Sequence, residues 1–297
     1  MLARVANDMS GKTVLITGGN AGIGKQAAIA LAKLGAKVVF TSRDPRKGEV
    51  ARAEAREAAD SEQIDCLALD LASFASIERF AQEFLDRYPR LDVLILNAGL
   101  VLDAPSKTVD GFETTFGVNH LGHFYLTSLL RERIVASAPA RIVVVSSDAH
   151  KGAREGLDFD DLMHANNYGV VKVYARSKLA NLLFTRALSA QLESTGVTVN
   201  ALHPGVVRTR FARDGDISRF KQALVAIGTP FMISPERGAR TTVYLASSPE
   251  VEGQSGGYYA RSRPAKMTKA ARDDEAASRL WTISEALIAK AIAERSA

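Results

Sequence analysis

The sequence predicts an α/β fold in which a mostly parallel sheet of seven strands is covered by helices on both faces. Short apolar segments alternate along the chain with longer segments of helical spacing. The apolar segments are nearly continuous, as expected for strands that are buried on both faces. No internal repeat or linker divides the 297 residues. We therefore expect one domain over residues 1–297, built from a first half at about 12–147 and a second half at about 148–297.

Each element of the first half has a local reason. Residues 13–17 (TVLIT) are rich in β-branched side chains and end in glycines, which predicts a strand. Apolar side chains then recur at helical spacing over 22–34 until Gly35, a residue type that commonly ends helices. Residues 37–41 (KVVFT) predict a second strand, and Pro45 opens an alanine-rich helix to about 59. A strand, a helix and a strand follow at 64–69, 73–88 and 91–96.

The second half continues the alternation but contains two irregular stretches. Its expected elements are a helix at 110–135, a strand at 141–145, a helix at 174–194, a strand at 197–202, a helix at 235–247 and a strand at 256–260. The irregular stretches, 148–173 and 206–234, each follow the carboxyl end of an expected strand. Ligands bind beyond these ends in open α/β sheets, so we expect both stretches to form a substrate lid.

Composition narrows the class of protein. Hydrophobic residues are 46% and charged residues 24% of the chain, which is ordinary for soluble globular proteins. Cys66 is the single cysteine, so no intramolecular disulfide can form. No segment has the roughly 20 apolar residues of a membrane span, and residues 1–12 lack the apolar core of a secretory signal, so we expect the cytoplasm. The net charge is +5, but basic and acidic residues are interspersed and no nucleic-acid partner is expected.

The turn after the first strand has the composition of a phosphate-binding loop. Residues 17–24 read TGGNAGIG, with Gly18, Gly22 and Gly24 spaced as G-x3-G-x-G. Glycines allow a sharp turn and a close approach of backbone N–H groups to a pyrophosphate, and the following helix directs its positive dipole end toward it. The sequence therefore predicts a nucleotide site here, although the spacing differs from the common GxGxxG pattern.

This spacing resembles the classical short-chain dehydrogenase/reductase family, whose fold is of the Rossmann type. The resemblance covers almost the whole chain, since the family's other motifs follow in order: Asp70-Leu71, Asn97-Ala98-Gly99, Asn119, Ser147, Tyr174-x3-Lys178, Pro204-Gly205 and Thr209. It implies that residues 12–147 bind a nicotinamide cofactor and residues 148–297 bind substrate. The expected cofactor-binding residues are Gly18, Asn20, Gly22, Ile23, Gly24, Ser42, Arg43, Asp70, Leu71, Asn97, Ala98, Gly99, Tyr174, Lys178, Pro204, Gly205 and Thr209.

The end of the second strand favours NADP(H) over NAD(H). An acidic residue at this position usually holds the ribose 2′-hydroxyl of NAD. Here the position is taken by Ser42, and Arg43 follows, whose guanidinium can bind a 2′-phosphate in a bidentate manner. The alternative is that Asp44, one or two residues later, takes the acidic role and the cofactor is NAD(H).

Tyr174 and Lys178 carry the expected chemistry. Four residues apart on a helix, they share one face. We expect the ammonium of Lys178, with the positive ring of the oxidised cofactor, to lower the pKa of the Tyr174 phenol, which can then serve as general acid or base. The resemblance further implies that Ser147, rather than Ser146, bonds the reacting oxygen, that Lys178 holds the nicotinamide ribose, and that Asn119 holds a water that links Lys178 to solvent.

The resemblance also narrows the branch of the family. Twenty-six residues separate Ser147 from Tyr174, about twice the usual gap, and residues 119–124 read NHLGHF. Both features look like the retinol dehydrogenase and WW-domain oxidoreductase branch, and protochlorophyllide reductases share part of the pattern. We expect an NADP(H)-dependent enzyme that interconverts an alcohol and a ketone or aldehyde on a hydrophobic small molecule.

Several alternatives stay open. They are a non-catalytic dinucleotide sensor or scaffold, a reductase of another carbonyl or C=C substrate, and, less compatible with the glycine spacing, a nucleotide-sugar epimerase or dehydratase. Family members often form dimers or tetramers through the two long helices at 110–135 and 174–194. We expect no metal, because no ligand cluster accompanies His120 and His123, which lie in a helical segment.

Overall fold

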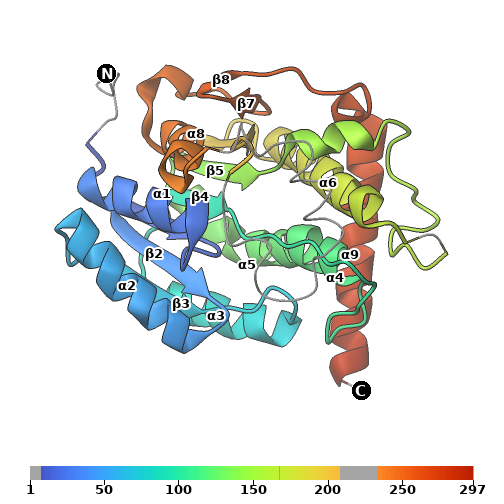
Figure 1. The fold of residues 1–297 in the computed structure, drawn as a ribbon, viewed down its shortest axis with the longest axis horizontal. Coiled ribbons are helices and arrows are strands. Elements are labelled where there is room, and N and C mark those ends of the chain that lie inside the picture. The colour runs from blue at the N-terminus through green and yellow to red at the C-terminus, as the bar shows by residue number, and fades with distance from the viewer. Residues whose placement is uncertain (1–7, 167, 208–232, 297) are drawn as a thin grey trace.

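The computed structural model describes residues 8–166, 168–207 and 233–296. Within them, eight strands form one sheet in the order β3-β2-β1-β4-β5-β6-β7-β8, with helices on both faces (Figure 1). All neighbours pair in parallel except the last two. The chain order reverses between β1 and β4, which is the position where open α/β sheets bind ligands. The expected mostly parallel α/β fold is confirmed.

Alternate side chains of each strand face two separate cores. The strands are β1 Thr13–Ile16, β2 Lys37–Ser42, β3 Ile64–Ala68, β4 Val93–Leu96, β5 Ala140–Val145, β6 Val197–His203, β7 Tyr258–Ala260 and β8 Arg263–Pro264. In β1, Val14 and Ile16 belong to one core and Leu15 to the other, and the register aligns Val14 with Val38 and Val93. This arrangement explains why the strands read as continuous apolar runs.

The helices divide between the two faces. One core receives α1 Gly22–Lys33, α2 Pro45–Ala59 and α8 Pro235–Ser247. The other receives α3 Phe74–Arg87, α5 Gly122–Ala136, α6 Val170–Gln191 and α9 Asp274–Ser296. Pro45 occupies the first turn of α2, where its missing N–H costs nothing, and Ser73 caps α3 by accepting from the N–H of Ser76.

Four elements differ from the sequence expectation. The helix expected at 110–135 begins with α4 at Thr114–Phe116 and passes through a π-helical turn, Gly117–Leu121, before α5. Helix α6 begins at Val170, where Val170 packs against buried Val101. The two-residue β8 pairs antiparallel with β7, so the sheet has eight strands rather than seven. Helix α9 was not among the expected elements, although Leu280 and Ile288 recur on one helical face.

The two expected lid segments have different outcomes. Residues 148–173 contain a 3₁₀ turn, Asp148–Gly152, and the first turn of α6. Most of 206–234, including Thr209, lies outside the described residues.

Helix α9 packs against α6 and also contacts α5 (Figure 1). The Trp281 ring stacks on Phe184 of α6 at 5.9 Å and packs against Phe124 of α5 at 4.6 Å. Leu280 is 1% exposed. Helix α9 thus covers part of the surface of α5 and α6.

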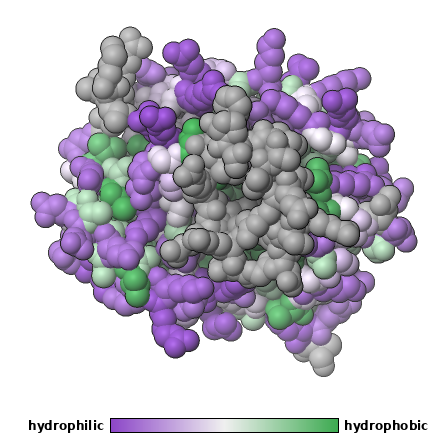
Figure 2. Space-filling model, in the orientation of Figure 1, coloured by the Kyte–Doolittle hydropathy of each residue, from purple (hydrophilic) through white to green (hydrophobic). Residues whose placement is uncertain are grey.

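The visible surface is mostly polar. Hydrophilic side chains surround the face drawn in Figure 2, and its hydrophobic patches are small and separate. Among the described helices, none combines the length and the apolarity needed to cross a bilayer.

Candidate active site

The glycine turn after β1 leaves room only for a backbone without side chains. Gly18 and Gly22 have φ of +68° and +55°, in the left-handed region that favours glycine. A Cβ on Gly24 would lie 2.5 Å from the carbonyl oxygen of Gly18, and one on Gly18 would lie 3.0 Å from the Cβ of Ala98. Since α1 begins at Gly22 with no side-chain cap, its free N–H groups face the turn. The turn fits a pyrophosphate.

Thr17 and Asn97 hold this turn to the end of β4. The Thr17 hydroxyl oxygen accepts the backbone N–H groups of Asn97 and Ala98 at 2.9 and 3.0 Å. The Asn97 amide donates to the carbonyls of Thr17 and Gly18 at 2.8 and 3.1 Å. The N–H of Gly18 donates to the hydroxyl of Thr41 at 3.1 Å. Asn97 therefore shapes the turn through its side chain, and Thr41 is a further residue of the site that was not expected from the sequence.

A cleft of about 330 Å³ opens beside this turn at the carboxyl ends of the strands. It brings together many of the residues expected to bind cofactor: Gly18, Asn20, Ser42, Arg43, Asp70, Leu71, Ala98 and Gly99. It also includes Asp44, the alternative acidic residue, and adds residues that were not expected: Thr41, Lys47, Leu69, Leu100, Val101, Leu102 and Val118. Its lining does not include Gly22, Ile23, Gly24, Asn97, Tyr174, Lys178, Pro204 or Gly205. Gly205 follows β6 with φ of +92°.

The charged groups at the end of β2 have distinct tasks. The Asp44 carboxylate caps α2 by accepting from the N–H groups of Arg46 and Lys47, and these bonds hold its pKa below the ordinary value. The Ser42 hydroxyl donates to the Asp44 carbonyl at 2.7 Å. Arg43 and Lys47 are exposed and line the cleft. Lys47 was missed because its place in the cleft depends on how α2 packs.

Tyr174, Lys178 and Ser147 come together at the end of β5. Lys178 is 3% exposed, its Nζ donates to the Val145 carbonyl at 3.1 Å, and the same Nζ lies 5.6 Å from the centre of the Tyr174 ring. A hydrogen bond joins the side chains of Tyr174 and Ser147. A Cβ on Gly99 would lie 3.4 Å from the Lys178 Nζ, so this group adjoins the glycine-lined cleft.

Burial dominates the proton affinities of this group. It raises the pKa of Tyr174 to about 12, against which the hydrogen bond with Ser147 acts in the lowering direction. It lowers the pKa of Lys178 to about 8. In the chain without cofactor, desolvation thus raises the pKa of Tyr174 rather than lowering it, and the Lys178 ammonium lies over the ring. The expected lowering, which included the positive ring of the oxidised cofactor, stays a prediction for the complex.

The two neighbouring serines point to different partners. The Ser146 hydroxyl is buried and donates to the Lys178 backbone carbonyl at 2.8 Å. The Ser147 hydroxyl accepts from the N–H of Ala149 at 3.1 Å and meets Tyr174. Ser146 thus fixes the backbone of α6, whereas Ser147 faces the phenol.

Asn119 lies fully buried in the π-helical turn. Its Oδ1 accepts from the Leu100 N–H at 2.8 Å, and its Nδ2 donates to the Leu100 carbonyl at 2.9 Å and to the Ser177 hydroxyl at 3.0 Å. Both amide hydrogens are thus engaged, so a water held by this residue would bond to the remaining lone pair of Oδ1 or to the backbone carbonyl. The side chain itself ties the chain after β4 to α6.

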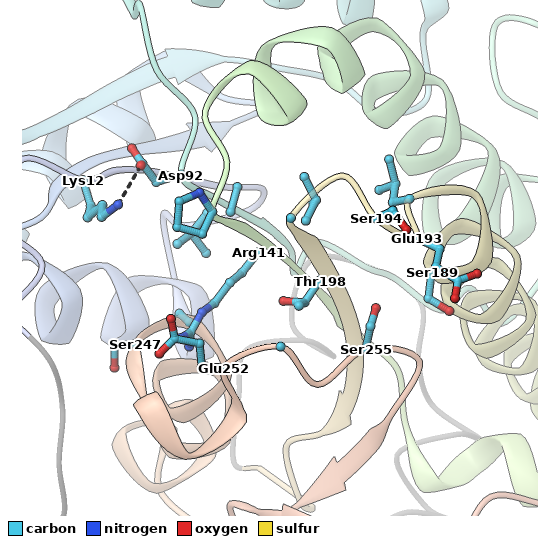
Figure 3. Close-up of a pocket in the computed structure, with 18 of the residues that line it drawn as sticks. Lys12, Asp92, Arg141, Ser189, Glu193, Ser194, Thr198, Ser247, Glu252 and Ser255 are labelled. Atoms are coloured by element: carbon cyan, nitrogen blue, oxygen red, sulfur yellow. Dashed lines mark hydrogen bonds and ion pairs between the residues drawn. The ribbon is translucent and has the colours of Figure 1, made fainter.

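A larger cleft lies at the opposite ends of the strands. It measures about 830 Å³ and is formed at the amino ends of β1, β4, β5 and β6 (Figure 3). Its buried acid, Asp92, pairs with Lys12 at 3.1 Å and with Arg90 at 2.7 Å, and Arg141 donates to the carbonyls of Leu245 and Ser248. These groups are already partnered and hold the sheet edge. Among the described residues, no cluster of three or more His, Cys, Asp or Glu suits a metal ion.

Comparisons with known proteins agree with this geometry. The family model of short chain dehydrogenases matches residues 12–159 and 162–217. Human retinol dehydrogenase 14 is 47% identical over 294 residues, covering 94% of this chain and 87% of that protein. Human retinol dehydrogenase 13 is 43% identical, covering 94% and 85%.

Solved structures show the same fold. An uncharacterized protein from Mycobacterium paratuberculosis is 34% identical, with a TM-score of 0.75 and 95% of both chains covered. The Pseudomonas aeruginosa RhlG/NADP complex is 25% identical, with a TM-score of 0.67, covering 84% of this chain and 94% of that one.

The chain belongs to the short-chain dehydrogenase/reductase family. It is accordingly an oxidoreductase of the alcohol and carbonyl class that uses a nicotinamide dinucleotide. Within the family it falls in the retinol dehydrogenase-like branch.

Proposed function

We propose that this protein is an NADP(H)-dependent oxidoreductase that interconverts an alcohol and a ketone or aldehyde on a hydrophobic small molecule, with Tyr174 as general acid and base. The observation that carries the proposal is the group formed by Tyr174, Ser147 and Lys178 next to the glycine-lined cleft. A sensor without catalysis has no need for a phenol and a hydroxyl in hydrogen-bond contact beside a buried ammonium.

The chain's own residues supply the proton chemistry. With its pKa raised by burial, the phenol of Tyr174 is protonated at neutral pH and can donate to a carbonyl oxygen. Ser147 donates a second hydrogen bond where negative charge develops on that oxygen. Lys178, whose Nζ donates to the Val145 carbonyl, would hold the ribose of the cofactor. The bound cofactor supplies the hydride.

The charge distribution in the cleft supports NADP(H). Asp44, the acid that would favour NAD(H), is engaged as the cap of α2. Arg43 and Lys47 are exposed cations beside it and can bind a 2′-phosphate. We infer that both contribute to cofactor selectivity.

Apolar residues beside Tyr174 support a hydrophobic substrate. Tyr174 and Val170 pack against Val101, and Val171 of the same helix turn exposes 62% of its surface. The similarity to retinol dehydrogenases makes retinal, the aldehyde of retinol, the first substrate to test.

Exchange of Tyr174 for phenylalanine tests the reaction. NADPH consumption is measured with retinal and a panel of aldehydes, ketones and quinones. We expect Tyr174→Phe to lower kcat at least about 100-fold, the contribution of a positioned general acid, while the Kd of NADPH changes little. An unchanged kcat would refute the role of Tyr174. No turnover across the panel by a parent protein that binds NADPH tightly would favour the sensor.

Exchange of the two cations tests the cofactor. Arg43→Ala and Lys47→Ala should each raise the KM for NADPH by about tenfold or more, because each removes a charge-assisted bond to phosphate, and should leave the KM for NADH nearly unchanged. Arg46→Ala is the matched control, since Arg46 lies on the same helical turn but does not line the cleft. A parent protein that prefers NADH by tenfold would contradict NADP(H) selectivity.

A further inference from the structure

His123 is a buried titratable residue that the proposed reaction does not use. It lies in α5, 3% exposed, one turn after Asn119. Its ring meets two parts of the site: Nε2 lies 2.9 Å from the Thr17 hydroxyl oxygen, and Nδ1 lies 3.3 Å from the Asn119 backbone carbonyl oxygen. It therefore contacts both the strand end that holds the glycine turn and the π-helical turn that holds Asn119.

The hydrogen-bond partners of its two ring nitrogens define the tautomer of His123. A carbonyl oxygen only accepts, so the Nδ1 that faces Asn119 must carry a hydrogen. The Thr17 oxygen already accepts two N–H groups, from Asn97 and Ala98, so its own hydrogen is free to be donated. The His123 Nε2 at 2.9 Å is a closer acceptor for it than the Ile95 carbonyl at 3.4 Å. The ring is thus neutral, with hydrogen on Nδ1 alone.

The surroundings keep the ring neutral. Burial lowers the pKa of His123 to about 3, and the charge of Lys178 acts in the same direction. A protonated His123 would lose the bond from Thr17 and would place a second cation near Lys178.

The two bonds reach different halves of the site. Thr17 orients Asn97 and Ala98, which shape the glycine turn. Asn119 orients Leu100 in the cleft and Ser177, the neighbour of Lys178 on α6. Because the His123 ring bonds to both Thr17 and Asn119, it fixes the distance between the glycine turn and the π-helical turn that supports Lys178.

We propose that His123 is a positioning residue that, as a neutral Nδ1–H imidazole, couples the glycine turn through Thr17 to the Asn119 turn. The proposal rests on the proposed function, because it assigns the two arms of the ring to cofactor binding and to proton transfer.

Two substitutions separate the hydrogen bond to Thr17 from the hydrogen bond to Asn119. Asparagine keeps a donor near the Nδ1 position and loses the acceptor for Thr17, so His123→Asn should raise the Kd of NADPH about tenfold, as expected when a buried donor loses its partner. Glutamine keeps an acceptor near the Nε2 position and loses the donor to Asn119, so His123→Gln should lower kcat about tenfold, shift the pH profile of kcat and leave the Kd of NADPH near that of the parent.

The control is Ser137→Ala, at the other end of the same helix. Ser137 is buried and accepts from the Leu91 N–H at 2.9 Å, so its loss costs a buried hydrogen bond far from the site. This variant should melt at a lower temperature than the parent and keep its Kd and kcat. The proposal is overturned if both His123 variants behave in the same way.

Spectroscopy of the parent protein tests the tautomer without any substitution. With ¹⁵N-labelled histidine, the chain's five histidines give resolvable ring signals. We expect the His123 signals of a neutral Nδ1–H ring, unchanged between pH 5 and 9. An Nε2–H ring or a titrating one overturns the proposal even if the variants do not fold. If the parent protein binds neither NADPH nor NADH, the proposed function is refuted. The spectra still test the tautomer of His123 in that case.

Discussion

Lys178 is the residue for which the structure predicts opposite effects on stability and on activity. Its ammonium is almost completely buried and donates a hydrogen bond to the Val145 carbonyl. Replacing it with methionine keeps a chain of similar length and removes the buried charge. The Val145 carbonyl keeps the Asn181 amide, at 3.4 Å, as a donor. We predict that Lys178→Met is inactive and more stable than the parent at pH 7.

The size of the stabilisation follows from the pKa of Lys178. Burial lowers it from 10.5 to about 8. A tenfold change in proton affinity corresponds to about 1.4 kcal/mol, so keeping the folded lysine charged costs about 3 kcal/mol. Loss of the hydrogen bond to Val145 offsets about 1 kcal/mol of this, leaving a gain of about 2 kcal/mol.

The stability difference between the parent and Lys178→Met depends on pH in a definite direction. Below pH 8 the lysine is charged in both states, and its full cost is present. Between pH 8 and 10.5 the unfolded chain holds more protons than the folded one, so the parent gains stability relative to the variant as the pH rises. The advantage of Lys178→Met should therefore vanish across this interval.

Urea unfolding of cofactor-free protein between pH 6.5 and 10.5 measures this difference. Lys172→Met is the control, because Lys172 lies on the same helix and is partly exposed to water. A variant less stable than the parent at pH 7, or a difference that does not change with pH, would refute the reasoning.

Two further predictions concern packing. Gly24→Ala should weaken NADPH binding by about tenfold or more, because its Cβ would lie 2.5 Å from the Gly18 carbonyl oxygen and overpacking of this kind costs about 1–3 kcal/mol. Fluorescence titration measures the Kd of NADPH, and an unchanged Kd would contradict the role of the glycine turn. Leu280→Ala on α9 should lower the free energy of unfolding by about 2–5 kcal/mol while the Kd of NADPH stays constant, which urea unfolding and the same titration would check; full retention of stability would show that α9 does not belong to the core.

Local features of the site were readable from the sequence. Gly18, Gly22 and Gly24 identify a turn because glycine alone tolerates its backbone and contacts. Tyr174 and Lys178 share a helix face because four residues make about one turn. The missed helix α9 belongs to the same kind of signal, since its apolar spacing was present in the sequence.

Contacts between distant segments were not readable in this way. The place of Lys47 in the cleft depends on the packing of α2, and the engagement of both Asn119 amide hydrogens depends on where Leu100 and Ser177 come to lie. For His123 the sequence predicted only that it binds no metal. Its contact with Thr17 could not be predicted, because Thr17 lies 106 positions away in the sequence, whereas Asn119 lies only 4 positions away.

The amino-acid sequence by itself determined most of the strands and helices, the glycine turn and the pairing of Tyr174 with Lys178, because each depends on neighbours within one or two helical turns. Only the tertiary structure decided the direction of the Tyr174 pKa, the division of tasks between Ser146 and Ser147, and the covering of α5 and α6 by α9. The physical reason is that desolvation and long-range hydrogen bonding come into being only when the whole chain has packed.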